Sequence, residues 1–167
     1  MPIPGIVFRQ GERNDLNQII RLLADDPLSG DLESAQDISA ERIPKACQQA
    51  WEDVVASKEN QILVAAKGVQ VIAVLQLTMI PSLTLRGSRR AQIEGVRVAS
   101  AYRSQGVGSQ LMRWAIDLAK EGNCELVQLT MDRRRERAID FYRRLGFVAS
   151  HEGFKMQLDA QAGPDDG

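Results

Sequence analysis

Two glycines separated by one residue stand directly before an apolar run of helical period in the stretch RSQGVGSQLM, residues 103–112. Glycine adopts a positive φ easily and lets another group approach the bare backbone. The first turn of a helix leaves several N–H donors without an acceptor, and its dipole favours negative charge. Gly106 and Gly108 therefore predict a turn that binds an anionic group at the start of a helix.

Two common nucleotide-binding signatures fail at this turn. The dinucleotide fingerprint G-x-G-x-x-G needs a third glycine, and this chain has Leu111 at that position. The nucleoside triphosphate loop needs Gly-Lys followed by Ser or Thr, and neither tripeptide occurs in the chain. The anion is therefore expected to belong to another kind of ligand.

The turn is positioned by a predicted strand before it, AQIEGVRVAS at 91–100, and a predicted helix after it. Hydrophobic periodicity elsewhere predicts strands at 6–10 and 125–131, a hairpin over 61–80, and helices around 16–23, 43–55 and 138–145. The segment FVASHEGFKMQL, residues 147–158, predicts two closing strands. This order indicates one α/β (α+β) domain over 1–158 with a mixed sheet and helices on both faces, followed by a disordered tail at 159–167.

Composition narrows the class of protein. Hydrophobic residues make up 44% of the 167 residues and charged residues 26%, which is typical of a globular domain. The formal net charge of −1 argues against a general nucleic-acid binder. Cys47 and Cys124 lack the spacing of a metal or redox motif and are interpreted as reduced core residues. Without a leader or a long apolar run, a cytoplasmic protein that is not bound to a membrane is expected.

Two motifs in order resemble those of the GNAT superfamily of N-acetyltransferases. The first is R-x-x-G-x-G, formed by Arg103, Gly106 and Gly108 directly after IEGVRV. The second lies in TMDRRRERAIDFYRRLGF, where A-x-x-F-Y-x-x-x-G-F is matched from Ala138 to Phe147. The opening FRQGERNDLNQIIRLL is similar to the first strand and helix of the family, so the resemblance covers the chain apart from its tail.

The resemblance implies a mostly antiparallel central sheet of six to seven strands and acetyl-CoA as co-substrate, without a metal. It also implies that backbone at Val96 to Val98 pairs with pantetheine and that the glycine turn wraps the pyrophosphate. Arg135 stands where many members carry Asn, and it either reaches a phosphate or is a solvated charge. The implied cofactor-binding residues are Val96, Arg97, Val98, Arg103, Ser104, Gln105, Gly106, Val107, Gly108, Ser109, Arg135, Ala138 and Phe141.

Two residues stand at positions where the resemblance implies catalytic groups. Glu94, before a strand glycine that suggests a bulge, is the predicted general base for the amine, acting directly or through water. The alternative is that Glu94 has a structural role on the face of the strand, where it pairs with Arg90 or Arg97. Tyr142 is the predicted general acid for the CoA sulfur, and a packing ring is the alternative. His151, the only histidine, is expected at the surface.

The acceptor is the least determined part of the prediction. In the family, the segments corresponding to 25–28 and 86–90 border the acceptor site; the first is acidic here and the second is rich in arginine. A small-molecule primary amine is the predicted acceptor, with a peptide or protein amine as the alternative. An acyl-CoA sensor or interaction module without turnover is the alternative from another class. A homodimer is also compatible with these expectations.

Overall fold

The computed structural model of the protein describes residues 3–25 and 43–156. The chain divides into two units, Met1–Met131 and Asp132–Gly167. Among the described residues, the first unit holds five strands and three α-helices, and the second holds one α-helix, α4 (Glu136–Arg144). In chain order the first unit contains β1 (Val7–Gln10), α1 (Leu16–Ala24), α2 (Lys45–Ala56), β2 (Asn60–Lys67), β3 (Gln70–Ile80), β4 (Arg89–Val98), α3 (Val107–Glu121) and β5 (Cys124–Leu129).

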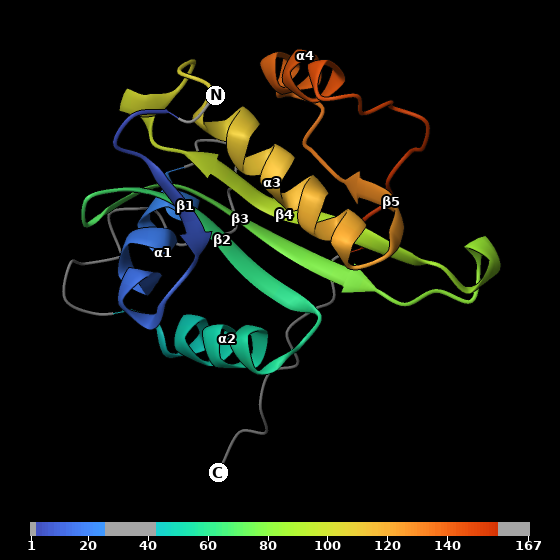
Figure 1. Ribbon diagram of the computed structural model, residues 1–167, viewed down its shortest axis with the longest axis horizontal. Coiled ribbons are helices and arrows are strands. Elements are labelled where there is room, and N and C mark those ends of the chain that lie inside the picture. The colour runs from blue at the N-terminus through green and yellow to red at the C-terminus, as the bar shows by residue number, and fades with distance from the viewer. Residues whose placement is uncertain (1–2, 26–42, 157–167) are drawn as a thin grey trace, which may run out of the picture. The chain divides into compact units, whose positions relative to one another are not determined.

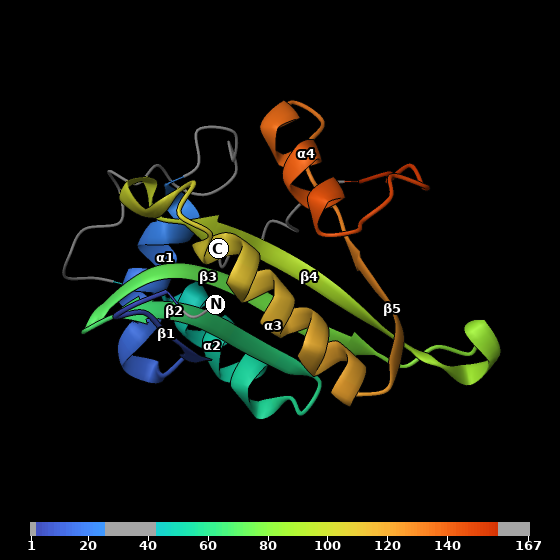
Figure 2. The ribbon, with the colours of Figure 1, turned by 45° about the horizontal axis from the view of Figure 1, so that its top comes forward.

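The five strands form one sheet in the order β1-β2-β3-β4-β5. The first four strands pair antiparallel, and β5 pairs parallel to β4. A parallel pair needs a long crossover, and here the connection runs through α3. Helix α3 crosses one face of the sheet, and α1 and α2 cover the other (Figures 1 and 2). The predicted α/β architecture with helices on both faces is confirmed.

Alternation along the strands gives the sheet two apolar faces, as a sheet between helices requires. On the face of α1 and α2, the core cluster consists of Leu16, Ile19, Ile20, Trp51, Val64, Val71 and Val74. Helix α3 contributes Val107, Leu111, Met112, Ala115 and Ala119, each fully buried, to the opposite face. The apolar stripe that the sequence predicts for α3 is therefore buried, whereas in α2 only Trp51 is buried and Val55 is exposed.

The predicted closing strands are wrong for the described part of that segment. Residues 147–156 form no strand, and the sheet of the described residues has five strands rather than six to seven. Three of the large apolar side chains in this segment, Val148, Phe154 and Met156, are at least 81% exposed. Strand formation depends on a partner edge and on packing, which a local apolar pattern does not provide. The predicted tail at 159–167 lies outside the described residues.

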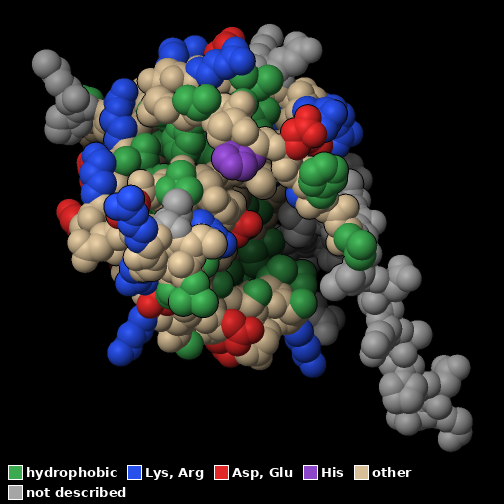
Figure 3. All heavy atoms as spheres, turned by 90° about the vertical axis from the view of Figure 1, so that its right-hand side faces the viewer, with side chains coloured by type: hydrophobic (Ala, Val, Ile, Leu, Met, Phe, Trp, Pro, Cys, Tyr) green, Lys and Arg blue, Asp and Glu red, His purple; other side chains and the backbone are tan. Residues whose placement is uncertain are grey.

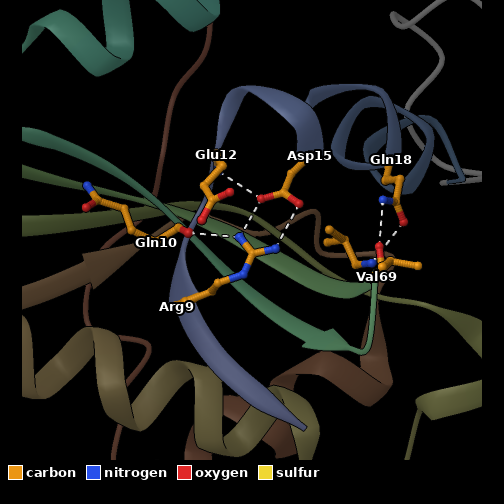
Figure 4. Close-up of polar contacts among 7 residues, drawn as sticks. Arg9, Gln10, Glu12, Asp15, Gln18 and Val69 are labelled. Carbon is orange, nitrogen blue, oxygen red and sulfur yellow. Dashed lines mark hydrogen bonds and ion pairs between the residues drawn. The ribbon is translucent and has the colours of Figure 1, made fainter.

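A buried ion pair fixes the start of α1 to β1. Arg9 donates through Nη1 and Nη2 to the two carboxylate oxygens of Asp15, at 2.5 and 2.9 Å (Figure 4). Asp15 Oδ2 also accepts the backbone N–H of Glu12 at 2.8 Å. The Arg9 guanidinium, which is the largest contribution, and this N–H lower the pKa of Asp15 despite its burial.

Asp15→Asn is expected to lower the free energy of unfolding by about 2 kcal/mol near neutral pH, because Arg9 then loses a charged partner. The native pKa of Asp15 is lowered, so its contribution is present above the pKa of the unfolded state and disappears as pH falls through the native value. The free energies of unfolding of the wild-type and Asp15→Asn proteins should therefore become more similar as pH falls. Urea unfolding between about pH 7 and about pH 3 measures this change. Asp53→Asn, at an exposed carboxylate of α2, is the control, and an equal loss in both variants would contradict the assignment.

Helix α1 also holds the turn between β2 and β3. Gln18 Nε2 donates to the carbonyl oxygen of Val69 at 3.0 Å, and Gln18 Oε1 accepts the N–H of Val71 at 2.9 Å (Figure 4). One amide side chain thus satisfies a backbone group in the predicted hairpin turn and another at the start of β3. The first helix and the hairpin are thereby fixed to each other on one side of the sheet.

Candidate active site

The sheet divides between β4 and β5. Their parallel ladder runs from Arg89–Cys124 to Ile93–Leu129 and stops there, whereas β4 stays paired with β3 as far as Val98. The edge of β4 that faces away from β3 therefore has no neighbouring strand from Glu94 to Val98 among the described residues. This segment is called the open edge below.

A β-bulge at Gly95 lies at the start of the open edge. The register with β3 shifts between Val74 and Gln76, so two residues of β4, Gly95 and Val96, oppose the single residue Leu75. Gly95 has a φ of +62°, and a Cβ at this position would lie 3.2 Å from Leu23 Cδ2 of α1. The interruption that the sequence indicated at this glycine is therefore a change in strand geometry.

The backbone groups of Val96 and Val98 point to the open edge. Ala99 donates its N–H to the carbonyl of Ile72 at 2.8 Å, on the β3 side. Because successive peptide groups of a strand point to opposite edges, the N–H and C=O groups of Val98 and Val96 point away from β3. Their carbonyls accept hydrogen bonds from Arg103 Nε, at 3.0 Å to Val98, and from Arg97 Nη1, at 2.9 Å to Val96. The two N–H groups remain as donors for an extended ligand.

The glycine turn ends at the start of α3. Ser104 and Gly106 adopt left-handed φ values of +61° and +84°, and Gly106 is the N-cap residue of the helix. No side chain caps this helix, so the N–H groups of Val107, Gly108 and Ser109 lack an intrahelical or capping acceptor. Three donors and the helix dipole therefore meet at this turn, as the predicted anion-binding turn requires.

Hydrogen bonds and one ion pair hold this turn beside the open edge. Gln105 Nε2 donates to the carbonyl of Ala101 at 2.7 Å. Besides its bond to Val98, Arg103 lies 3.9 Å from the carboxylate of Asp25, just after α1, and both of these side chains are exposed. An exposed ion pair at this distance contributes little to stability and is readily replaced. The Arg103 guanidinium is therefore available for a stronger anionic partner.

Glu94 lies at the bulge with its side chain exposed to solvent. It is in register with Gln76 of β3, on the face of the sheet opposite α3. In the described part of the chain it forms no ion pair with Arg90 or Arg97, the two partners that a purely structural interpretation required. A carboxylate in this position is free to accept a proton from a group at the open edge.

In the second unit, Tyr142 lies in an aromatic cluster on α4. Its ring packs edge-on against Phe141, with centroids 5.1 Å apart, and against Phe147 at 5.9 Å. Gly146 has a φ of +95°, which turns the chain so that Phe147 can donate its N–H to the carbonyl of Tyr142. The glycine and aromatic residues of the second motif therefore fix the orientation of the tyrosine ring.

The remaining predicted residues of the second unit surround the start of α4. Arg135 is the N-cap residue, and Ala138 follows in the first turn, both half-buried. Arg134 pairs with Asp132 and holds the pKa of that carboxyl below its usual range. His151 is exposed, as predicted (Figure 3). The described part of the chain thus places these residues in one unit and Glu94, the open edge and the glycine turn in the other.

The acceptor-side segments behave differently from one another. Of residues 25–28, only Asp25 lies within the described residues. Arg89 forms an ion pair with Glu59, whereas Arg90 Nη1 donates to Ser82 Oγ at 3.4 Å.

The sequence analysis did not identify a set of polar side chains on the same sheet face as Glu94. The signal was present as polar residues at alternate positions of apolar strands: Asn60, Gln76, Thr78, Gln92 and Gln128.

Two further classes of site have no candidate in the described part of the chain. Its residues contain no cluster of three or more His, Cys, Asp or Glu side chains arranged to hold a metal ion. None of the helices within 3–25 and 43–156 is long and apolar enough to span a membrane. Both cysteines, Cys47 and Cys124, are free thiols and half-buried.

The described residues thus combine a split mixed sheet with an uncapped glycine turn between β4 and the following helix α3. The family to which such a protein belongs is shown by sequence. The pattern of the Acetyltransferase (GNAT) family matches residues 17–147, and the chain belongs to this family. The predicted recognition, and an acetyltransferase at the level of the family, are thereby confirmed.

One solved structure and two curated proteins illustrate what the chain is similar to. A transcriptional regulator from Bacillus halodurans C-125 has a TM-score of 0.83 and 42% identity, over 92% of this chain and 99% of that chain. Aminoalkylphosphonate N-acetyltransferase of Salmonella typhimurium is 36% identical over 67 residues, which is 40% of this chain and 44% of that protein. N-alpha-acetyltransferase 30 of Xenopus laevis is 35% identical over 71 residues, 42% of this chain and 26% of that protein. The matches to the curated relatives therefore span less than half of their length.

Proposed function

We propose that the protein transfers the acetyl group of acetyl-CoA to a primary amine of a small molecule. The observation that carries the proposal is the open edge of β4, which leads directly into the glycine turn. Donors at Val96 and Val98 and the uncapped start of α3 follow one another along the chain. An extended molecule with amide groups at one end and phosphates at the other matches this order of donors.

The glycine turn and the open edge would hold the co-substrate, and bound acetyl-CoA would supply an activated thioester. The N–H groups of Val107, Gly108 and Ser109, together with Arg103, bind the pyrophosphate. The donors of Val96 and Val98 align the pantetheine amides like an added strand. The N–H of Val96 polarises the thioester carbonyl and stabilises the oxyanion that forms during attack.

Glu94 and Tyr142 have complementary proton-transfer roles in the proposed reaction. Glu94 accepts the proton that the ammonium group must lose before its nitrogen attacks, directly or through one water. The C–N bond then forms, the C–S bond breaks, and Tyr142 donates its phenolic proton to the departing sulfur. Arg97, Arg135, Ala138 and Phe141 line the co-substrate in this scheme. Family membership and the exposed, unpaired Glu94 support these assignments.

A small-molecule acceptor is favoured by the Salmonella typhimurium relative, which is named for an aminoalkylphosphonate. Similarity to the Xenopus laevis N-alpha-acetyltransferase supports the alternative acceptor, the N-terminus of a protein or peptide. The Bacillus halodurans relative is described as a transcriptional regulator, which favours a second function, an acyl-CoA-dependent regulator without turnover. A cytoplasmic location is part of the proposal, and the two free thiols support it.

Thiol release from acetyl-CoA in the presence of pooled primary amines tests the proposal, with mass spectrometry to identify the product. Release that requires an amine is expected. Gly108→Val should weaken CoA binding in calorimetry about tenfold or more, because a branched side chain at the second residue of α3 blocks the phosphate. Arg113→Val, which places the same side chain at an exposed position of α3, is the control. CoA binding without release would support the regulator, and unchanged binding in a folded Gly108→Val protein would reject the phosphate site.

A further inference from the structure

One face of the sheet changes from apolar to polar where its helical cover ends. On the side of α1 and α2, Val64 and Val74 are buried in the core cluster. Further along the same strands, the apolar Ile62, Ile80 and Leu126 share that face with several polar side chains. They lie in adjacent register positions, Gln76 opposite Glu94 and then Asn60, Thr78, Gln92 and Gln128 across four strands. The five uncharged residues among them, Asn60, Gln76, Thr78, Gln92 and Gln128, are called the amide strip below.

Hydrogen bonds join the members of the amide strip. Thr78 Oγ1 donates to Asn60 Oδ1 at 2.6 Å, and Gln76 Nε2 donates to the same oxygen at 3.3 Å. Gln128 Nε2 donates to Gln92 Oε1 at 2.8 Å. A side-chain amide has two donor hydrogens and two acceptor lone pairs, so these bonds use only part of the capacity. The strip therefore presents fixed, neutral donors and acceptors.

Opposite charges lie near the start and in the middle of β4 on this face. Arg90, Gln92 and Glu94 occupy alternate positions of β4, so their side chains share the face, and the Cα atoms of Arg90 and Glu94 are about 13 Å apart. No carboxylate of the described residues pairs with Arg90, and its Nε is buried without a hydrogen-bond partner. Its sequence neighbour Arg89 points to the other face and pairs with Glu59. Within the described ranges, Arg90 is thus a half-buried arginine without an anionic partner.

We infer that Arg90 binds an anionic group of the acceptor, which makes the acceptor a primary amine with a carboxylate or phosphate at its far end. The inference rests on the proposed function, because Glu94 then marks the position of the amine. The middle of such an acceptor lies over the amide strip and carries hydroxyl or amide groups, since an apolar chain would leave strip donors and acceptors unpaired. A guanidinium binds either anion through two parallel hydrogen bonds.

Glycine oligomers test this inference because they combine an amine, amide groups and a carboxylate at variable separation. An extended chain spans ~3.5 Å per residue, so triglycine places its termini ~10 Å apart. The probes are glycine, diglycine, triglycine and tetraglycine, each compared with its C-terminal carboxamide. The kcat/KM of the acids is expected to be highest near triglycine and about tenfold or more above that of the matching carboxamide.

Arg90→Gln is expected to remove the preference for the acid, so that triglycine and its carboxamide react with similar kcat/KM, while Arg90→Lys retains part of the preference. Arg86→Gln, at an exposed arginine in the same segment, is the control and should retain it fully. Calorimetric binding of triglycine and its carboxamide to the CoA-bound protein repeats the comparison without turnover. Equal rates and equal binding of acid and carboxamide in the wild-type protein, or a preference that survives in a folded Arg90→Gln variant, would overturn the inference.

These measurements separate the inference from the proposed function. Acetylation of alkylamines or carboxamides without a preference for acids would leave the function intact and reject the anion site. A binding preference that depends on Arg90, without thiol release from any amine, would reject the function and retain the anion site.

Discussion

Glu94→Gln is expected to lower kcat by about 10²- to 10³-fold at neutral pH and to leave acetyl-CoA binding unchanged. Glutamine keeps the size and the hydrogen-bonding capacity of the side chain but cannot accept a proton. As pH approaches the pKa of an alkylammonium, about 10, more of the acceptor is already neutral, and the variant should recover part of its rate. Initial rates from about pH 6 to about pH 10 at saturating acetyl-CoA measure this recovery.

Glu125→Gln provides the matched control, because Glu125 is an exposed glutamate on the neighbouring strand β5. It should leave both the rate and the pH profile of the wild-type protein unchanged. A Glu94→Gln profile that superimposes on the wild-type profile would remove the proton-transfer role. The same holds for a rate loss of constant size across the pH range, because that result indicates a positional defect.

Tyr142→Phe is expected to lower kcat by about 10²-fold while the protein keeps its fold. The substitution removes only the hydroxyl group, so the edge-on contacts of the ring with Phe141 and Phe147 remain. If the hydroxyl protonates the departing sulfur, the rate of Tyr142→Phe relative to the wild-type rate should fall less for an acetyl thioester of a more acidic thiol. Single-turnover rates with thioesters of different thiol pKa measure this dependence.

Tyr102→Phe is the control for this experiment, since Tyr102 is the only other tyrosine of the chain and lies beneath Lys67. Its rate with every thioester should match the wild-type rate. A Tyr142→Phe protein whose deficit is the same for all leaving groups would assign the ring to packing. An undiminished rate would do the same.

The elements that carry the candidate site could be predicted from sequence because their determinants are local. Gly106 lies where the chain needs a left-handed residue before a helix, and the apolar period of α3 begins at the next residue. Gly95 similarly marked the bulge in β4. The glycine turn and the interrupted strand are therefore properties of short stretches, which a sequence pattern records directly.

Features that depend on pairing between distant segments could not be predicted in this way. The apolar residues of 147–156 have the period of a strand, yet a strand also needs a partner edge. The amide strip requires the register of four strands, because each of its residues alone is an ordinary polar strand residue. Arg89 and Arg90 are equivalent in sequence, and only the pleat of β4 sends them to opposite faces.

An unpaired edge inside a sheet is ordinarily a hazard, because it offers a strand of another molecule a ready pattern of hydrogen bonds. The open edge of β4 is short, because it begins at the bulge of Gly95 and the strand ends at Val98. The guanidinium groups of Arg97 and Arg103 bond the two outward carbonyls and add positive charge. The geometry that admits an extended ligand at this edge therefore also discourages aggregation through it.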